Sequence, residues 1–242
     1  MTRSELSEEL KILPEALRKA YEQSCIDNNH FLLCGLAGTG TAFAYKLLIL
    51  MEIADNNSRK IIIFDDQGDL KCVAEEFGAN ILSINDLNGT LLEGFSYILY
   101  NSDNLKQQPD INKKMYDLIA EMEDNYTVFF STLGNLSRVG DVAKLLRKDN
   151  IRIVFREYDL DHYTDEILNL IPYAVLLSIS ASDRKLAGKI YDIPDDFLKE
   201  ITGREPLRGI IHGPLGNDKM ALKNTNKWKM YNILASVPND ID

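Results

Sequence analysis

Short, continuous apolar runs alternate with segments of helical hydrophobic spacing along most of the chain. The runs cover residues 30–35, 60–64, 80–84, 97–100, 127–131, 151–155, 175–178 and 209–212. Several runs are rich in β-branched or aromatic residues and lack polar alternation. This pattern is typical of strands in a sheet that is covered on both faces. We therefore predict eight strands of a buried sheet.

Between these runs, apolar residues recur at i, i+3, i+4 and i+7, which indicates amphipathic helices. Such stripes lie within residues 43–54, 115–122 and 139–146. The alternation of strands and helices predicts an α/β fold with a mostly parallel central sheet and helices on both faces.

Three parts of the chain differ in character. Residues 1–29 resemble a helical lead-in, and residues 30–213 carry the strand and helix alternation of a core. Residues 214–242 are polar, contain a Gly-Asn-Asp turn signal and are expected to close the domain. A repeat or a low-complexity linker is not found in the sequence.

Composition narrows the possible functions. The 242 residues include 27 basic and 37 acidic side chains, which give a formal net charge of −10. Such an acidic chain is poorly suited to wrapping bare nucleic acid, which needs a surplus of Lys and Arg.

No apolar run approaches the roughly 18 residues of a membrane span. The three cysteines, Cys25, Cys34 and Cys72, have no metal-binding spacing and are expected to be reduced thiols.

A glycine-rich segment follows the first strong strand and precedes a predicted helix. Gly35 and Gly40 match the glycine frame of a P-loop, GxxxxGK[ST]. In such a loop, successive backbone N–H groups point at a phosphate, with a helix N-terminus behind them. The backbone of Ala37, Gly38 and Thr39, together with Gly40, is therefore a candidate anion-binding loop.

The side chains that a P-loop uses for chemistry are missing from this segment. Thr41 stands at the lysine position, and Ala42 stands at the position of the Ser or Thr that holds Mg²⁺. Lys46 lies five residues beyond Thr41 on the predicted helix, rotated away from the loop-facing side. We expect the loop to be degenerate, with ATP and Mg²⁺ binding weak or absent.

The acidic partner of a P-loop is missing as well. A P-loop motor places an Asp, often followed by a second acid, at the end of a buried strand. We assign this role to the strand at residues 97–100, after which Asn101 and Ser102 occupy the acidic positions. Asp103 comes one or two places late, and strand faces alternate, so its side chain is expected to face elsewhere. No catalytic or metal-binding residue is assigned.

Two further interpretations of the residues stay open. Gly38, Gly40 and Phe43 form an imperfect dinucleotide fingerprint, with Asp65 and Asp66 about 25 residues on as candidate ribose-binding acids. The large Phe43 at the third glycine position argues against this Rossmann interpretation. The acidic residues between 157 and 165 are a weak metal-site candidate, although acids also favour the start of a helix.

Several segments resemble FtsK/SpoIIIE-type motors. Residues 30–40 (HFLLCGLAGTG) are similar to the P-loop entry HLLIAGxTGSGK, and residues 130–133 (FSTL) stand where the family has its ATQ strand end. Residues 141–155 resemble the DVITGxIKxNIPxRIxF stretch. Residues 176–188 resemble the LLSGSRDEGxLxG segment of type VII secretion motors, and residues 203–209 stand in for its Pro-Pro-Gly-Arg-Gly turn.

Within this family, the best match is the C-terminal domain of an EssC/EccC-type coupling ATPase. The resemblance implies a RecA-like P-loop fold in a membrane-anchored motor with tandem ATPase domains. It also implies a place on the cytoplasmic side of the cell membrane, held there through the parent protein. Implied partners are small helical secreted substrates and the neighbouring ATPase domains of the same motor, and no nucleic acid is expected.

We therefore interpret the chain as a pseudo-ATPase domain that serves recognition or regulation and does not hydrolyse ATP. One alternative is an ATPase domain of a secretion or DNA-translocation motor that still binds nucleotide. The other is the dinucleotide-binding Rossmann protein. Loss of the loop lysine and of the strand-end acids favours the first hypothesis.

Overall fold

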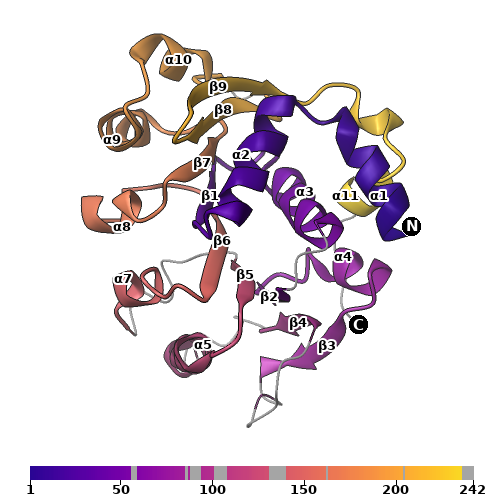
Figure 1. The fold of residues 1–242 in the computed structure, drawn as a ribbon. Coiled ribbons are helices and arrows are strands. Elements are labelled where there is room, and N and C mark those ends of the chain that lie inside the picture. Colours follow the sequence, from indigo (N-terminus) through magenta and orange to yellow (C-terminus); the bar gives the residue numbers. More distant parts are fainter. Residues whose placement is uncertain are drawn as a thin grey trace.

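The nine strands of the described residues form one sheet, seen nearly end-on in Figure 1. The computed structural model describes residues 1–55, 59–84, 87, 94–100, 108–130, 140–161, 163–203 and 205–235. The strand order is β3-β4-β2-β5-β6-β1-β7-β8-β9. Strands from β3 to β7 in this order pair in parallel, whereas β8 pairs antiparallel with both β7 and β9. The strands are β1 (Phe31–Cys34), β2 (Lys60–Asp65), β3 (Asn80–Ser83), β4 (Phe95–Leu99), β5 (Tyr126–Phe130), β6 (Ile151–Glu157), β7 (Tyr173–Leu176), β8 (Arg208–Gly213) and β9 (Gly216–Ala221).

Helices cover both faces of this sheet (Figure 1). One face is covered by α1 (Arg3–Glu9), η1 (Leu10–Ile12), α2 (Glu15–Ile26), α3 (Thr41–Ala54), α4 (Lys71–Glu76) and α11 (Tyr231–Ala235), with η3 (Thr225–Lys227) preceding α11. The other face is covered by α5 (Gln108–Glu121), α7 (Val142–Leu145), α8 (Asp165–Asn169), α9 (Ala181–Tyr191) and α10 (Asp195–Glu200). Because both faces are covered, strands such as β1 and β5 are buried along their whole length.

The predicted fold class is confirmed, and each of the eight predicted strands is present. The ninth strand, β9, was not predicted, because it is polar and only Met220 among its residues is buried. It lies in the predicted closing segment but extends the sheet antiparallel to β8. The helix expected within residues 139–146 is reduced to the four residues of α7. The three-part division of the chain stays a prediction.

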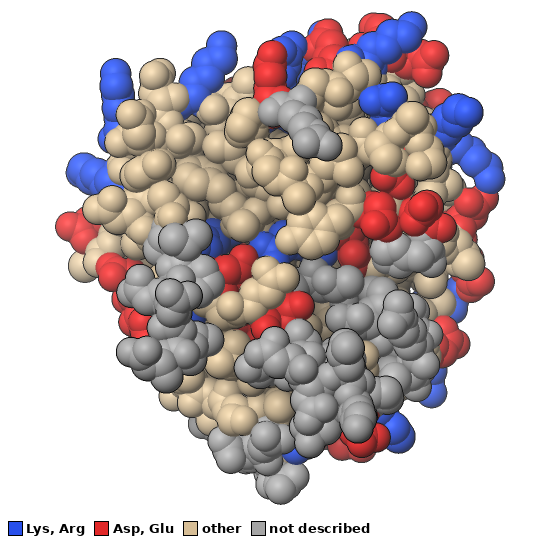
Figure 2. Space-filling view, turned by 180° about the vertical axis from the view of Figure 1, so that it is seen from behind, with Lys and Arg blue, Asp and Glu red and all other residues tan. Residues whose placement is uncertain are grey.

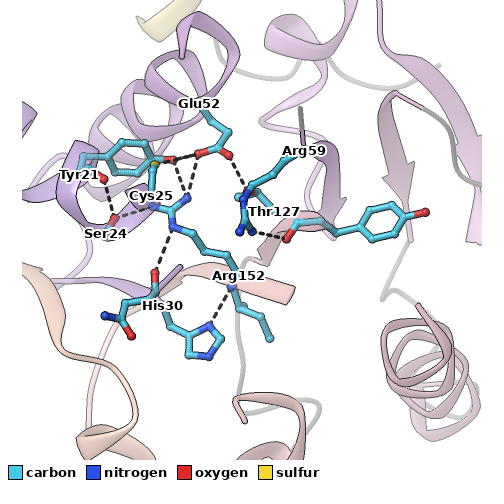
Figure 3. Close-up of polar contacts among 11 residues, drawn as sticks. Tyr21, Ser24, Cys25, His30, Glu52, Arg59, Thr127 and Arg152 are labelled. Atoms are coloured by element: carbon cyan, nitrogen blue, oxygen red, sulfur yellow. Dashed lines mark hydrogen bonds and ion pairs between the residues drawn. The ribbon is translucent and has the colours of Figure 1, made fainter. Parts of the chain in front are cut away.

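A buried polar network joins the lead-in helix α2 to α3 and the sheet (Figure 3). The guanidinium of Arg152 on β6 donates to Glu52 Oε2 of α3 at 2.8 Å and to Ser24 Oγ of α2 at 2.7 Å. Glu52 also accepts hydrogen bonds from the Tyr21 hydroxyl at 2.7 Å and from the Thr127 hydroxyl at 2.5 Å. The side chains of Arg152 and Glu52 are 0% and 1% exposed, so each ion depends on the other for compensation.

His30 extends this network toward the amino end of β6. The Arg152 Nε donates to the carbonyl oxygen of Asn29, and the next residue, His30, is 4% exposed. The amide of Ile153 donates to His30 Nδ1 at 2.9 Å, and Nε2 lies 2.7 Å from the carbonyl oxygen of Leu146. This geometry requires the neutral ring with its proton on Nε2, because Nδ1 must accept. These bonds give His30 a structural role.

Removing one partner of the buried ion pair is expected to destabilise the fold strongly. Glu52→Gln keeps the shape of the side chain but leaves the Arg152 charge buried and uncompensated, which typically costs about 3–5 kcal/mol. Urea unfolding followed by circular dichroism measures this loss. The matched control is Glu166→Gln, because Glu166 pairs with Arg147 at the surface, where both side chains are more than half exposed. Equal stability of the two variants would contradict the role given to the network.

Acid should destabilise the domain in part through His30. Burial, together with the nearby positive charge of Arg152, lowers the pKa of His30 to about 4, although the hydrogen bond to Leu146 opposes this shift. The unfolded chain binds this proton near pH 6.5, so stability is complete above pH 6.5 and is lost as the pH falls toward 4. The loss amounts to about 3 kcal/mol.

The measurement is the free energy of unfolding as a function of pH for the native chain and for His30→Gln. The glutamine variant should be less stable at pH 7 but should show a flatter decline between pH 6.5 and 4. Parallel curves for the two proteins would show that His30 does not titrate on unfolding.

Candidate functional site

The candidate loop connects the interior strand β1 with helix α3, as predicted. It begins at Gly35, directly after Cys34, and ends at Gly40, which precedes the first helical residue. Gly40 has φ of +89°, a left-handed conformation that only glycine adopts at little cost. Gly35 is required for a different reason. A Cβ atom there would lie 2.8 Å from the Cβ of Leu177, which follows β7.

Backbone hydrogen bonds fix the first half of the loop. The amide of Gly35 donates to the carbonyl oxygen of Glu157 at 3.0 Å, and the amide of Leu36 donates to that of Ser178 at 2.7 Å. The Thr39 amide and hydroxyl both donate to the carbonyl oxygen of Leu36, at 3.2 and 2.7 Å. Thr39 is 0% exposed, so its side chain packs into the interior, whereas Ala37 and Gly38 before it are exposed.

The second half of the loop keeps open donors. Within the part of the chain that the structure describes, the amides of Gly38, Gly40, Thr41 and Ala42 donate no hydrogen bond. These groups lie at the N-terminus of α3, which has 14 residues. Unsatisfied amides at the start of a helix favour a negatively charged ligand. The arrangement can therefore bind an anion through backbone groups alone.

The side chains around these donors supply no cation and no metal-binding hydroxyl at the P-loop positions. Thr41, at the lysine position, is 5% exposed, and its Cγ2 methyl group faces Gly35. Ala42, at the hydroxyl position, ends in a methyl group. Lys46 lies more than one turn further along α3 and is 2% exposed. The assignment of Gly35, Ala37, Gly38, Thr39, Gly40, Thr41 and Ala42 as a degenerate nucleotide loop stays a prediction.

The predicted acidic positions, Asn101 and Ser102, lie outside the described residues. The strand that leads to them, β4, is four positions from β1 in the sheet. Neighbouring strands lie about 4.8 Å apart, so the end of β4 is about 19 Å from the loop strand. An acid that shares Mg²⁺ with the loop must lie much closer. The sheet order therefore argues against using the end of β4 for this role.

Strands β5 and β6 lie nearer to the loop. β6 is paired directly with β1, and β5 is the next strand, about 10 Å from β1. The sheet order thus favours the end of β5 as the acid-bearing position. The residues that follow β5 in the sequence are Ser131 and Thr132, which lie outside the described part and are not acidic. The expected acid-bearing position therefore moves from the end of β4 to the end of β5, but the sequence provides a carboxylate at neither position.

The end of β6 carries two buried charges that the sequence analysis did not assign to the site. Arg156 pairs in register with Leu33 of β1, and its Nη1 lies 2.9 Å from Asp69 Oδ2. Glu157, the first of the acidic residues between 157 and 165, is 1% exposed and accepts a hydrogen bond from the Tyr163 hydroxyl. The alternation of charged and apolar residues in the run IRIVFRE is the signal that could have placed Arg156 on one buried face.

The geometry contradicts the Rossmann alternative. In that fold the strand with the ribose-binding acid lies beside the glycine-loop strand. Here β2 is separated from β1 by β5 and β6. Asp65, at the end of β2, is 0% exposed and accepts hydrogen bonds from the amides of Gln67, Gly68 and Leu70 and from the Tyr97 hydroxyl. Burial, and then the charge of Asp69, raises the pKa of Asp65 to about 6. Asp65 is the cap of a turn.

The structure gives little support for a metal site or for a reactive cysteine near the loop. Among the described residues, no group of three or more His, Cys, Asp or Glu side chains is placed to hold a metal ion. Cys25, Cys34 and Cys72 are free thiols. Cys34 immediately precedes the loop, and burial, followed by the charge of Asp183, raises its pKa well above the ordinary value. A protonated, buried thiol is a poor nucleophile.

Comparisons with known proteins identify the fold. No protein-family model and no curated protein matches the chain. Among solved structures, VirB4 of Thermoanaerobacter pseudethanolicus is similar with a TM-score of 0.61 and 9% identity, covering 80% of this chain and 89% of that one. The bacterial conjugative coupling protein TrwB is similar with a TM-score of 0.59 and 13% identity, and the alignment covers 81% of this chain and 86% of the TrwB chain.

A third similar structure is the cytoplasmic domain of the type VII secretion ATPase EccC from Thermomonospora curvata. Its TM-score is 0.54 at 14% identity, and the alignment covers 85% of this chain and 27% of that one. Identities this low show a shared fold alone. The chain therefore has a RecA-like P-loop ATPase fold, as predicted, and it corresponds to about a quarter of the EccC chain.

Proposed function

We propose that this chain is a catalytically degenerate P-loop ATPase domain of a type VII secretion motor, which serves substrate recognition or regulation. The observation that carries the proposal is a loop of P-loop form in which Thr41 and Ala42 replace the cation and the metal-binding hydroxyl. The sequence resemblance to type VII motors and the structural similarity to EccC, a type VII secretion ATPase, support this motor class.

The missing groups should weaken nucleotide binding severely. A hydrogen bond to a charged group contributes about 1.5–3 kcal/mol. The loop lacks the lysine contact to the phosphates, the hydroxyl contact to Mg²⁺ and an acid after β5. Losing two or three such contacts lowers affinity by several powers of ten, since each 1.4 kcal/mol is a factor of ten. We therefore propose that ATP and Mg²⁺ bind to this loop weakly or not at all.

The backbone donors give the loop a residual capacity for simple anions. The structure of the similar protein TrwB is a complex with sulphate. In this chain, the amides of Gly38, Gly40, Thr41 and Ala42 are available to such an anion. Affinity should be low, because an anion held by neutral donors gains no charge pairing.

The proposed partners are small helical secreted substrates and neighbouring ATPase domains. On the face in Figure 2, basic side chains lie mostly at the margin and are interspersed with acidic ones, and an extended uncharged area occupies the upper middle. This distribution suits protein contacts better than the phosphate backbone of a nucleic acid. No helix among the described residues is long and apolar enough to cross a bilayer. We place the domain at the cytoplasmic side of the membrane through a parent protein.

A second candidate function is a residually nucleotide-binding ATPase domain. Arg156 favours it, because this cation lies on the strand beside β1 and its Nε has no hydrogen-bond partner among the described residues. Arg156 is 1% exposed, however, and Asp69 already neutralises its charge at 2.9 Å. A nucleotide would have to displace Asp69 before using this cation. We therefore rank this function second.

The deciding experiment is phosphate release from ATP and Mg²⁺. The unmodified domain should show no turnover above background, because neither a lysine in the loop nor an acid directly after β5 is available. Gly40→Arg is the control, because it blocks the loop: a Cβ atom at Gly40 would already lie 2.6 Å from Leu207 Cδ2. Robust turnover that Gly40→Arg abolishes would show that other side chains complete the site, and the second candidate function would then replace the first.

Variants that restore the missing P-loop side chains provide a second test, of nucleotide binding. Thr41→Lys combined with Ala42→Ser should raise ATP affinity only modestly, since a carboxylate directly after β5 would still be missing. Calorimetry with ATP and Mg²⁺ measures the gain. A return to the affinity of an active P-loop ATPase with these two changes alone would show that this chain supplies the acid from a strand other than β5.

A further inference from the structure

The segment before β8 contacts the loop at its last glycine. The amide of Leu207 donates to the carbonyl oxygen of Thr39 at 2.9 Å. The side chain of Leu207 lies against Gly40, because a Cβ atom built on Gly40 would come within 2.6 Å of Leu207 Cδ2 and 2.8 Å of Leu207 Cγ. Leu207 therefore holds the Thr39–Gly40 peptide by a hydrogen bond and by packing.

The geometry of this peptide determines what the contact does. In a trans peptide, the carbonyl oxygen and the following N–H point in opposite directions, and the described residues contain no cis peptide. Because Leu207 holds the oxygen of Thr39, the N–H of Gly40 must point away from Leu207. Gly40 N–H is one of the open donors. Leu207 therefore supports the loop from behind and does not occupy the side on which the donors are free.

A second contact ties the other end of the loop to the same segment. The carbonyl oxygen of Ser178 accepts the amide of Leu36 at 2.7 Å, and the hydroxyl of Ser178 donates to the carbonyl oxygen of Gly203. Residues at both ends of the loop are thus connected, directly or through Ser178, to the chain that leads into β8. These contacts hold the loop without any ligand.

Leu207 adopts an unfavourable conformation to make this contact. Its φ is +60°, a left-handed conformation that is strained for a residue with a side chain. The conformation is maintained because the amide of Leu222, after β9, donates to the carbonyl oxygen of Leu207 at 3.0 Å. Strained residues persist where the surrounding structure over-determines them, often at functional sites. This strain is an independent sign that the position of Leu207 matters.

We propose that Leu207 is a positioning residue that holds the loop after β1 in its anion-binding conformation when no ligand is bound, and so couples the loop to the β8–β9 ribbon. The anion-binding part rests on the proposed function, whereas the positioning part concerns the empty loop. In an ordinary P-loop, bound phosphates and the lysine help to order the loop. Here, Leu207 does so from the opposite side.

The test compares Leu207→Ala with Leu215→Ala. Leu215 lies in the turn between β8 and β9 and is 87% exposed, so it controls for loss of a leucine from the same ribbon. Backbone order parameters of Gly38 and Gly40 from ¹⁵N relaxation report on the empty loop. They should be near 0.85 in the native domain and in Leu215→Ala, and should fall below about 0.6 in Leu207→Ala.

Inorganic pyrophosphate, titrated without metal, reports on the anion-binding part. If only about a tenth of the loops in Leu207→Ala keep the binding conformation, the apparent dissociation constant rises about tenfold. Leu207→Met should restore both the order parameters and the affinity. If Leu207→Ala does not fold, Leu207→Gly takes its place, because glycine accepts the positive φ while losing the side chain.

The outcomes separate this proposal from the proposed function. Tighter pyrophosphate binding by Leu207→Ala would show that Leu207 blocks the loop and would overturn the proposal. Unchanged order parameters and affinity would overturn it as well. A loss of order at Gly40 in a domain that binds no pyrophosphate would support the positioning role and remove the anion-binding part. ATP turnover by the native domain would overturn the proposed function and leave the positioning role intact.

Discussion

A left-handed backbone at Gly40 is the constraint on which the candidate site rests. The positive φ lets the chain turn from β1 into α3, and no acceptor among the described residues takes the amides of Gly40, Thr41 and Ala42. This geometry depends on the backbone and on contacts with neighbouring segments. It does not depend on the lysine and hydroxyl that a catalytic P-loop carries at the next two positions. A loop of this form therefore does not require those two side chains, and Thr41 and Ala42 stand at their positions here.

A buried polar network, remote from the loop, joins α2 and α3 to the sheet. Arg152 and Glu52 form a fully buried ion pair, and hydroxyl groups from α2 and β5 complete it. This network lies where α2, α3 and the sheet meet, near the amino ends of the strands (Figure 3). Buried ion pairs contribute little net stability but penalise every arrangement in which one partner is left alone. The network therefore specifies how the lead-in helix docks, independently of nucleotide.

Much of the fold could be predicted from the sequence because the signal is local. Continuous apolar runs marked the eight strands, and Gly35 and Gly40 marked the turn between β1 and α3. Strand order is a property of long-range pairing, and hydrophobic pattern carries little information about it. For this reason the sequence placed the acidic positions after β4, although the sheet puts β5 and β6 beside the loop strand.

The residues that the sequence analysis missed are those whose role comes from distant partners. Arg156 looks like a surface charge until Asp69, 87 residues away, is found against it. Leu207 looks like an ordinary apolar residue, and neither its positive φ nor its bond to Thr39 has a sequence signature. The polar strand β9 was missed because only Met220 among its residues is buried, so it carries no apolar run. In each case, the structural role depends on tertiary contacts that the local sequence pattern does not reveal.

In the function that we propose, the loop binds anions through its backbone and has lost its metal-dependent nucleotide chemistry. The most direct measurement is a set of ¹H–¹⁵N spectra of the labelled domain, titrated with ATP in the presence and absence of Mg²⁺. The proposed function predicts weak shifts confined to the amides of residues 38–42, with the same dissociation constant in both series. A large Mg²⁺-dependent gain in affinity, with shifts spreading to a strand end beside β1, would contradict it.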